Sequence, residues 1–80
     1  MKNEISENIK AIISDYANND VGDPKYDDMP IRDIIDSIDF VDVTFEIEDK
    51  YGIVIDDDNF SNMINITLKE FIECVEKKIR

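Results

Sequence analysis

The chain has 80 residues, of which 42% are hydrophobic and 36% charged, and its formal net charge at pH 7 is −11. A chain of this length and hydrophobic content is expected to fold as one globular domain, residues 1–80, with no room for a deep catalytic cleft of the usual kind. The strong negative charge argues against DNA, RNA and anionic membranes as partners, because their phosphates would be repelled, and it favours proteins with basic surfaces.

The chain has one cysteine, Cys74, and no histidine, which limits the disulfides and the catalytic groups it can form. One cysteine cannot form a disulfide within the chain, and it is typical of a protein in a reducing compartment. No positively charged leader and no long apolar segment precede the domain, so we expect a cytoplasmic monomer without a membrane span. Because Cys74 lies off the apolar stripe of its predicted helix, we expect its thiol to be partly exposed.

The spacing of apolar residues predicts an amphipathic helix over residues 3–17, with Asn3 as its N-cap. Five residues of this segment fall on one helical face: Ile5, Ile9, Ile12, Ile13 and Tyr16. A long connection interrupted by glycine and proline follows. Its apolar side chains are expected to hold it against the core: Val21, Tyr26, Met29, Ile31, Ile34 and Ile35.

Residues 37–51 are rich in β-branched and aromatic residues, which is typical of a strand, but no partner strand is predicted and an isolated strand is unstable. We therefore predict a helix that ends at Gly52 and carries two apolar stripes on opposite sides. The first stripe comprises Phe40, Val43, Ile47 and Tyr51. The second stripe comprises Ile38, Val41 and Phe45. Acidic residues border the second stripe: Asp39, Asp42, Glu46, Glu48 and Asp49.

One of these two stripes must face the core. The other would then be an exposed apolar surface ringed by acids, which suits a partner with a hydrophobic centre and a basic rim. The alternative is that both stripes are buried and that the helix runs through the middle of the bundle.

A short third helix is predicted between residues 52 and 67, with its start at one of three consecutive aspartates and with Phe60, and Met63 or Ile64, pointing inward. These aspartates are Asp56, Asp57 and Asp58. They could bind a divalent ion weakly, but an EF-hand is excluded, because the glycine and glutamate that such a loop needs are missing from the required positions. No other metal site is predicted.

The last helix is predicted to begin with a capping box, in which Thr67 is the N-cap and Glu70 its reciprocal partner. Its apolar stripe comprises Leu68, Phe71, Ile72, Val75 and Ile79. The whole pattern predicts an all-α fold, a small four-helix bundle with a long first loop and a short third helix.

Ser37, at the start of the acidic helix, has no histidine to act as its general base, so the sequence predicts no active site and a protein that is not an enzyme. In one interpretation, Asp36 or Ser37 simply caps the helix. In the other, Ser37 presents an exposed hydroxyl that another enzyme modifies. A phosphate ester would be well tolerated there by the free backbone N–H groups of the helix start.

The segment DSIDFVDVTFEIEDKYGIVID, which begins at Asp36, resembles the second helix of acyl carrier proteins. The order and lengths of the predicted elements extend this resemblance across nearly the whole chain, as a single acyl-carrier-like domain. The resemblance implies that Ser37 carries 4′-phosphopantetheine and that Asp36 is the acid that precedes the modified serine. It also implies a set of partner-binding residues: Ile38, Asp39, Val41, Asp42, Phe45, Glu48 and Asp49. The sequence departs from the family at Ile34 and Ile35, where a leucine and a glycine are usual.

By this resemblance the protein is a carrier that a phosphopantetheinyl transferase modifies. It would hold acyl groups as thioesters and present them to fatty-acid, specialised lipid or polyketide biosynthetic enzymes. Acyl-transfer, synthase and reductase enzymes with basic docking patches are the implied partners. Two alternatives remain: a carrier of aminoacyl, peptidyl or D-alanyl groups, and an unmodified acidic helical adaptor that binds a basic partner.

Overall fold

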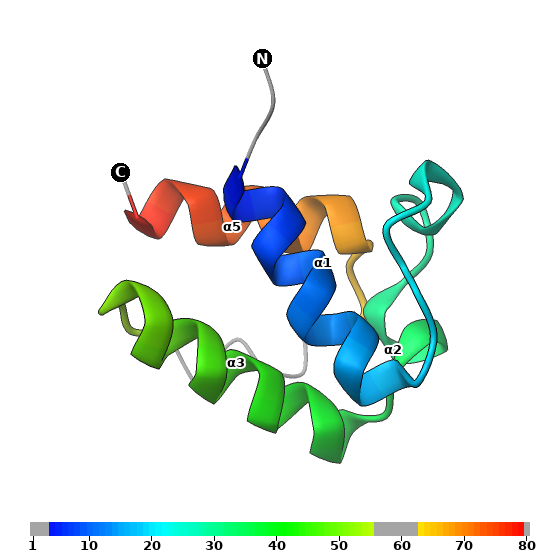
Figure 1. The fold of residues 1–80 in the computed structure, drawn as a ribbon, viewed down its shortest axis with the longest axis horizontal. Helices are drawn as coiled ribbons and strands as arrows, with labels where there is room; N and C mark the ends of the chain where they lie inside the picture. Colours follow the sequence, from blue (N-terminus) through cyan, green and yellow to red (C-terminus); the bar gives the residue numbers. More distant parts are fainter. Residues whose placement is uncertain (1–3, 56–62, 80) are drawn as a thin grey trace.

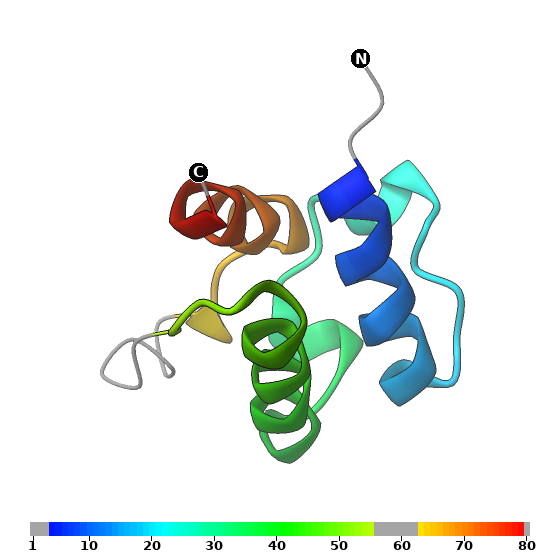
Figure 2. The same ribbon diagram turned by 60° about the vertical axis from the view of Figure 1, so that its left-hand side comes forward.

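The computed structural model describes residues 4–55 and 63–79. Three long helices, α1 (Glu4–Ala17), α3 (Ser37–Tyr51) and α5 (Leu68–Ile79), are arranged around one interior (Figures 1 and 2). The connection between α1 and α3 contains a 3-10 helix, η1 (Pro24–Tyr26), and a short helix, α2 (Ile31–Ile34). The predicted all-α bundle is confirmed. The start predicted for the short third helix, with Phe60, lies outside the described residues.

Helix α1 buries the face that its sequence spacing predicts. Ile9 and Ile13 are fully buried, and Ile5, Ile12 and Tyr16 pack against the core while remaining partly exposed. The helix ends where Asn18 adopts a left-handed conformation with φ 54°, which asparagine tolerates better than most residues. The N-cap predicted at Asn3 lies outside the described residues.

The long connection is held to the core as predicted. Val21, Ile31 and Ile35 are buried, whereas its other apolar residues are partly buried: Tyr26, Met29 and Ile34. Its backbone also pairs with the chain around the start of α5, since the Ile31 N–H donates to the Ile66 carbonyl at 2.9 Å and the Leu68 N–H to the Met29 carbonyl at 3.0 Å. Such pairing satisfies buried backbone groups, so this connection is a structured part of the domain despite its length.

The predicted capping box at the start of α5 is confirmed. The Glu70 N–H donates to Thr67 Oγ1 at 3.2 Å, and the Thr67 N–H donates to Glu70 Oε1 at 3.0 Å. The predicted stripe faces the core, with Leu68, Phe71, Ile72 and Val75 buried and Ile79 partly buried. Cys74 is partly exposed, as predicted.

An ion pair between Lys10 of α1 and Asp27 of the connection joins two elements at the edge of the core. The Lys10 Nζ lies 2.6 Å from Asp27 Oδ1, and the two side chains are 15% and 32% exposed. The Oδ1 atom itself is buried and has no other hydrogen-bond partner among the described residues. Losing the ammonium group therefore leaves a carboxylate oxygen buried and unpaired.

Replacing Lys10 with methionine is expected to lower the free energy of unfolding by about 1–2 kcal/mol, because the aliphatic stem is kept while the partner of Asp27 is removed. Urea denaturation followed by circular dichroism measures this change. Lys77→Met, an exposed site near the end of α5, is the matched control and should change the stability by less than about 0.5 kcal/mol. Equal effects of the two substitutions would contradict a stabilising role for this pair.

Candidate functional site

At the start of α3 the helix cap and the exposed serine are two different residues. Asp36 is the N-cap, with φ −82° and ψ 171°, and its Oδ1 accepts a hydrogen bond from the Asp39 N–H at 2.9 Å. Ser37 is the first residue of the helix and is exposed. Its hydroxyl forms no hydrogen bond with any residue in the described part of the chain. Of the two candidate caps, Asp36 has this role, so the Ser37 hydroxyl is not needed for helix capping.

The backbone at this position suits a phosphate ester. The first N–H groups of a helix have no partner within the helix, and here the cap satisfies the N–H of Asp39 while the Phe40 N–H bonds the Asp36 carbonyl at 2.9 Å. Within residues 4–55 and 63–79 the amides of Ser37 and Ile38 have no acceptor, so they can donate to a group from outside the helix. The residues present at the head of α3 fit a phosphodiester on the serine oxygen.

Ser14 differs from Ser37 in that its hydroxyl takes part in the hydrogen bonds of the fold. Its hydroxyl donates to the Lys10 carbonyl at 2.7 Å and accepts from the Val21 N–H at 2.9 Å. These two bonds tie the end of α1 to the following connection. Ser37 is exposed and has no such bonds among the described residues, so its hydroxyl is accessible to another molecule.

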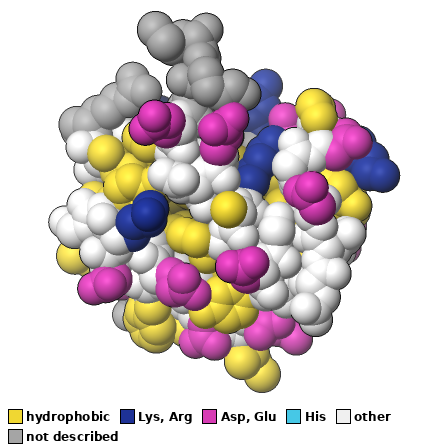
Figure 3. All heavy atoms as spheres, in the orientation of Figure 1, with side chains coloured by type: hydrophobic (Ala, Val, Ile, Leu, Met, Phe, Trp, Pro, Cys, Tyr) yellow, Lys and Arg dark blue, Asp and Glu magenta, His cyan; other side chains and the backbone are white. Residues whose placement is uncertain are grey.

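The two apolar stripes of α3 lie on opposite sides of the helix, one buried and one exposed. Phe40, Val43 and Ile47 are at most 2% exposed. On the other side, Ile38 is 75% exposed and Phe45 56% exposed, with Val41 partly buried between them. The alternative in which both stripes are buried is therefore wrong. Figure 3 shows acidic side chains (magenta) interspersed with hydrophobic ones (yellow) in the lower part of the view, where Figure 1 places α3.

The acidic residues of α3 divide between its two flanks. Tyr16 of α1 donates a hydrogen bond from its hydroxyl to Glu46 Oε2 at the protein surface. This bond, with further contributions from burial and from the negative charges of Glu46, Asp42 and Asp39, raises the pKa of Tyr16 to about 12. The phenol therefore stays protonated, and remains a donor, throughout the physiological pH range. Asp39, Asp42 and Glu46 are thus the acids of α3 whose charges act on Tyr16 of α1; we call them the acid row.

Glu48 lies apart from the acid row. Its Oε2 accepts a hydrogen bond from the Ile55 N–H at 2.6 Å, and the side chain is partly buried. The Gly52 N–H bonds the Glu48 carbonyl at 2.8 Å, with Gly52 in the left-handed conformation at φ 65° that ends the helix as predicted. Glu48 thus fixes the chain that leaves α3, in addition to the recognition role that the resemblance implies for it.

The structure places the other sequence-predicted residues at the surface of α3. Those classed as exposed are Asp36, Ser37, Ile38, Asp42, Phe45 and Asp49, and those partly buried are Asp39, Val41 and Glu48. Two further residues at the protein surface were given no surface role by the sequence interpretation. Tyr16 was assigned only to the core face of the first helix, and Val54, which is 79% exposed just after α3, was assigned no role. An apolar residue two positions beyond the terminal glycine is the one signal that could have indicated Val54.

Thr44 is the only buried polar residue in the described part of the chain, and the sequence interpretation gave it no role. Its hydroxyl donates to the Val41 carbonyl at 2.7 Å, one turn back in α3. This local bond satisfies the hydroxyl inside the core. Thr44 therefore belongs to the core side of the helix.

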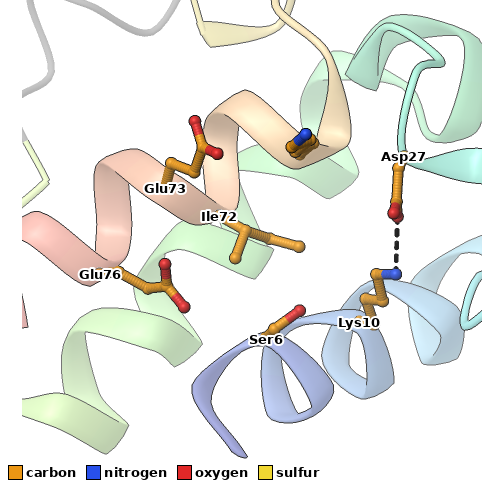
Figure 4. Close-up of a pocket in the computed structure, with 7 residues that line it drawn as sticks. Ser6, Lys10, Asp27, Ile72, Glu73 and Glu76 are labelled. Carbon is orange, nitrogen blue, oxygen red and sulfur yellow. Dashed lines mark ion pairs between the residues drawn. The ribbon is translucent and has the colours of Figure 1, made fainter. Parts of the chain in front are cut away.

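A pocket of about 230 Å³ lies between α1, the connection and α5, and no residue of α3 lines it (Figure 4). It is lined by Ser6, Lys10, Asp27, Lys69, Ile72, Glu73 and Glu76. Its charges are mixed, and the ion pair of Lys10 with Asp27 lies at one side. This pocket is therefore separate from the surface around Ser37.

The residues from 4 to 55 and from 63 to 79 contain no group of three or more acidic, histidine or cysteine side chains that could hold a metal ion. The possible weak site at Asp56, Asp57 and Asp58 lies outside the described residues. In the same part of the chain, no helix has the length and apolar character needed to cross a bilayer.

The comparison with protein families found one match. The family described as "phosphopantetheine attachment site" matches residues 7–75, which include all of α3 and most of α1 and α5. The searches of curated proteins and of solved structures found no match.

Proposed function

The chain belongs to the family of phosphopantetheine attachment domains, and from this we propose that Ser37 is its attachment residue and that the protein is an acyl carrier protein. Domains of this family carry a covalently attached 4′-phosphopantetheine group. They are carriers without catalytic activity of their own, and they interact with a phosphopantetheinyl transferase and with biosynthetic enzymes. The choice of Ser37 and of acyl cargo goes beyond the family match.

The observation that supports the choice of Ser37 is its exposed hydroxyl at the start of α3, which bonds no residue in the described part of the chain. The Asp36 side chain supplies the helix cap, so the serine can be esterified without loss of a capping bond. The N–H groups of Ser37 and Ile38, which have no acceptor among the described residues, would donate hydrogen bonds to the negatively charged phosphodiester.

The modification is a transfer to the serine oxygen. The Ser37 Oγ would form a bond to the phosphorus that bears the pantetheine of coenzyme A. The bond between that phosphorus and the bridging oxygen of the diphosphate breaks, and adenosine 3′,5′-bisphosphate leaves with the electron pair. The hydroxyl proton passes to a base of the transferase, since this chain has no histidine to receive it. Once bound, the group supplies a thiol that holds cargo as a thioester.

The exposed stripe of Ile38, Val41 and Phe45, bordered by the acid row, supports docking to partner enzymes with basic patches. Attachment of the cargo to a tether raises its effective concentration at each docked enzyme. Acyl cargo is proposed because the sequence around Ser37 resembles acyl carriers rather than peptidyl carriers. Fatty-acid, specialised lipid and polyketide enzymes are the proposed users, and the cytoplasm, where the lone Cys74 would stay reduced, is the proposed compartment.

Incubation with coenzyme A, Mg²⁺ and a broad-specificity phosphopantetheinyl transferase is expected to add the mass of one phosphopantetheine to the intact protein. The Ser37→Ala variant should gain none. Intact-protein mass spectrometry measures both. An unmodified wild-type protein would contradict the proposal and favour the acidic adaptor. Mass spectrometry of the thioester on protein isolated from its host distinguishes acyl from aminoacyl cargo.

A further inference from the structure

The pocket between α1, the connection and α5 carries its opposite charges on opposite sides (Figure 4). Lys10 and Asp27 lie on one side. Lys69 begins on the same side, because its N–H donates to the Asp27 carbonyl at 3.0 Å, and its side chain lines the pocket. Glu73 and Glu76 lie on the other side. The pocket therefore has a basic end and an acidic end.

Lys69 and Glu73 are the lining charges that the fold leaves unpaired. Lys10 is paired with Asp27, whereas the side chains of Lys69 and Glu73 form no ion pair or hydrogen bond within the described part of the chain. They do not pair with each other either, although they lie four positions apart on α5, a spacing at which opposite charges can meet. Lysine before glutamate is the less favourable order for such a pair. One charge of each sign is thus available to a ligand.

The position of each charge along α5 adds an electrostatic reason for a ligand. Lys69 is the second residue of a helix of 12 residues, where the helix dipole favours anions and disfavours cations. A carboxylate beside Lys69 would be attracted both by the ammonium group and by the positive helix end. Glu73 and Glu76 are three positions apart and repel each other, so an ammonium group beside them would be stabilised.

The dimensions of the pocket limit the size of the ligand. Four positions along a helix rise about 6 Å, so a ligand that reaches both Lys69 and Glu73 needs a spacer between its two charged groups. The pocket volume of about 230 Å³ is smaller than the roughly 300–1,000 Å³ of pockets for drug-sized ligands. Ile72 lies between the two ends in Figure 4 and offers an apolar contact for the spacer.

We propose that this pocket binds a small zwitterion, an ω-amino acid whose ammonium group and carboxylate are separated by about three methylene groups. Glu73 accepts hydrogen bonds from the ammonium group, Lys69 donates to the carboxylate, and Ile72 contacts the methylene groups. A ligand without net charge is not concentrated at the acidic surface of the protein as a whole, so its binding reports on the pocket. The site is independent of the proposed function, because no residue of α3 lines it.

Titration of the isotope-labelled protein with γ-aminobutyrate, followed by two-dimensional NMR, tests the proposal. The largest shifts are expected at Ser6, Lys69 and Glu73, which line the pocket. Glycine has its two charged groups on one carbon, and butyrate lacks the ammonium group, so each can form only one of the two ion pairs. Both should bind roughly threefold more weakly than γ-aminobutyrate. Equal affinities for the three ligands, or shifts centred on α3, would overturn the proposal.

Two variants test the ends of the pocket separately. Lys69→Met and Glu73→Gln each remove one charge from an exposed side chain, so each should keep the fold and weaken γ-aminobutyrate binding roughly threefold. Lys77→Met is the control, because this exposed lysine of α5 does not line the pocket, and it should leave the affinity unchanged. Full affinity in Lys69→Met, or an equal loss in Lys77→Met, would contradict the site. The titration uses neither coenzyme A nor a transferase, so its outcome does not bear on attachment at Ser37.

Discussion

Replacing Phe40 with alanine is expected to lower the free energy of unfolding by about 3–5 kcal/mol. Phe40 is 2% exposed, and its ring meets the ring of Phe71 edge-on with 5.1 Å between the centroids. Truncation removes this aromatic contact and leaves a cavity between α3 and α5. A single core in a chain of this length rarely supplies more than about 3–5 kcal/mol, so a large share of the variant should be unfolded.

Urea denaturation followed by far-ultraviolet circular dichroism measures the effect of Phe40→Ala. The wild type at the same temperature and salt concentration is the reference. A midpoint equal to that of the wild type would mean that the wrong stripe of α3 has been assigned to the core.

Replacing Phe45 with alanine is expected to leave the protein folded but to weaken its docking to the transferase. Phe45 is 56% exposed on the other side of the same helix, so its loss should change the free energy of unfolding by less than about 0.5 kcal/mol. An aromatic side chain at the centre of an interface carries a large part of the binding energy. The kcat/KM of the transferase for Phe45→Ala should therefore fall roughly tenfold or more.

The rate is measured at carrier concentrations well below KM, where it reports kcat/KM. Val54→Ala is the control, because Val54 is an exposed apolar residue outside the acidic helix. For the wild type, kcat/KM should also decrease as the salt concentration rises, since salt screens the acidic rim. Undiminished modification of Phe45→Ala would argue that the exposed stripe is not a docking surface.

Local sequence signals predicted the features that depend on local geometry. The capping box of Thr67 and Glu70 was identified because its two bonds span three residues. The two-sided character of α3 followed from the helical period alone, and the burial of Phe40 and exposure of Phe45 confirm it. The cap of α3 was predicted only to within one residue. Aspartate and serine are equally good caps, and only the backbone geometry distinguishes Asp36 from Ser37.

The periodicity of apolar residues does not predict contacts between segments that are distant in the sequence. Tyr16 and Glu46 are separated by 30 positions, and their contact depends on how α1 crosses α3. The different position of Glu48 was missed for a similar reason. In the sequence it is one acid among several, and its separation from the acid row depends on the path of the chain to Ile55.

For the long connection, the composition predicted packing against the core but not the backbone hydrogen bonds that also hold it. Its apolar residues were expected to hold it to the core, and Val21, Ile31 and Ile35 do so. The backbone pairing of Ile31 with Ile66 could not be predicted, because hydrogen bonds between irregular segments leave no repeating sequence pattern.

The central claim is that the prosthetic group is attached to the oxygen of Ser37, and peptide mapping tests it most directly. Trypsin cleavage after Arg32 and Lys50 yields a peptide in which Ser37 is the only serine. After reaction with coenzyme A and the transferase, this peptide is predicted to carry the whole mass increment, with fragment ions that place it on Ser37. An increment on a peptide that contains Ser6, Ser14 or Ser61, or one that persists in Ser37→Ala, would contradict the account.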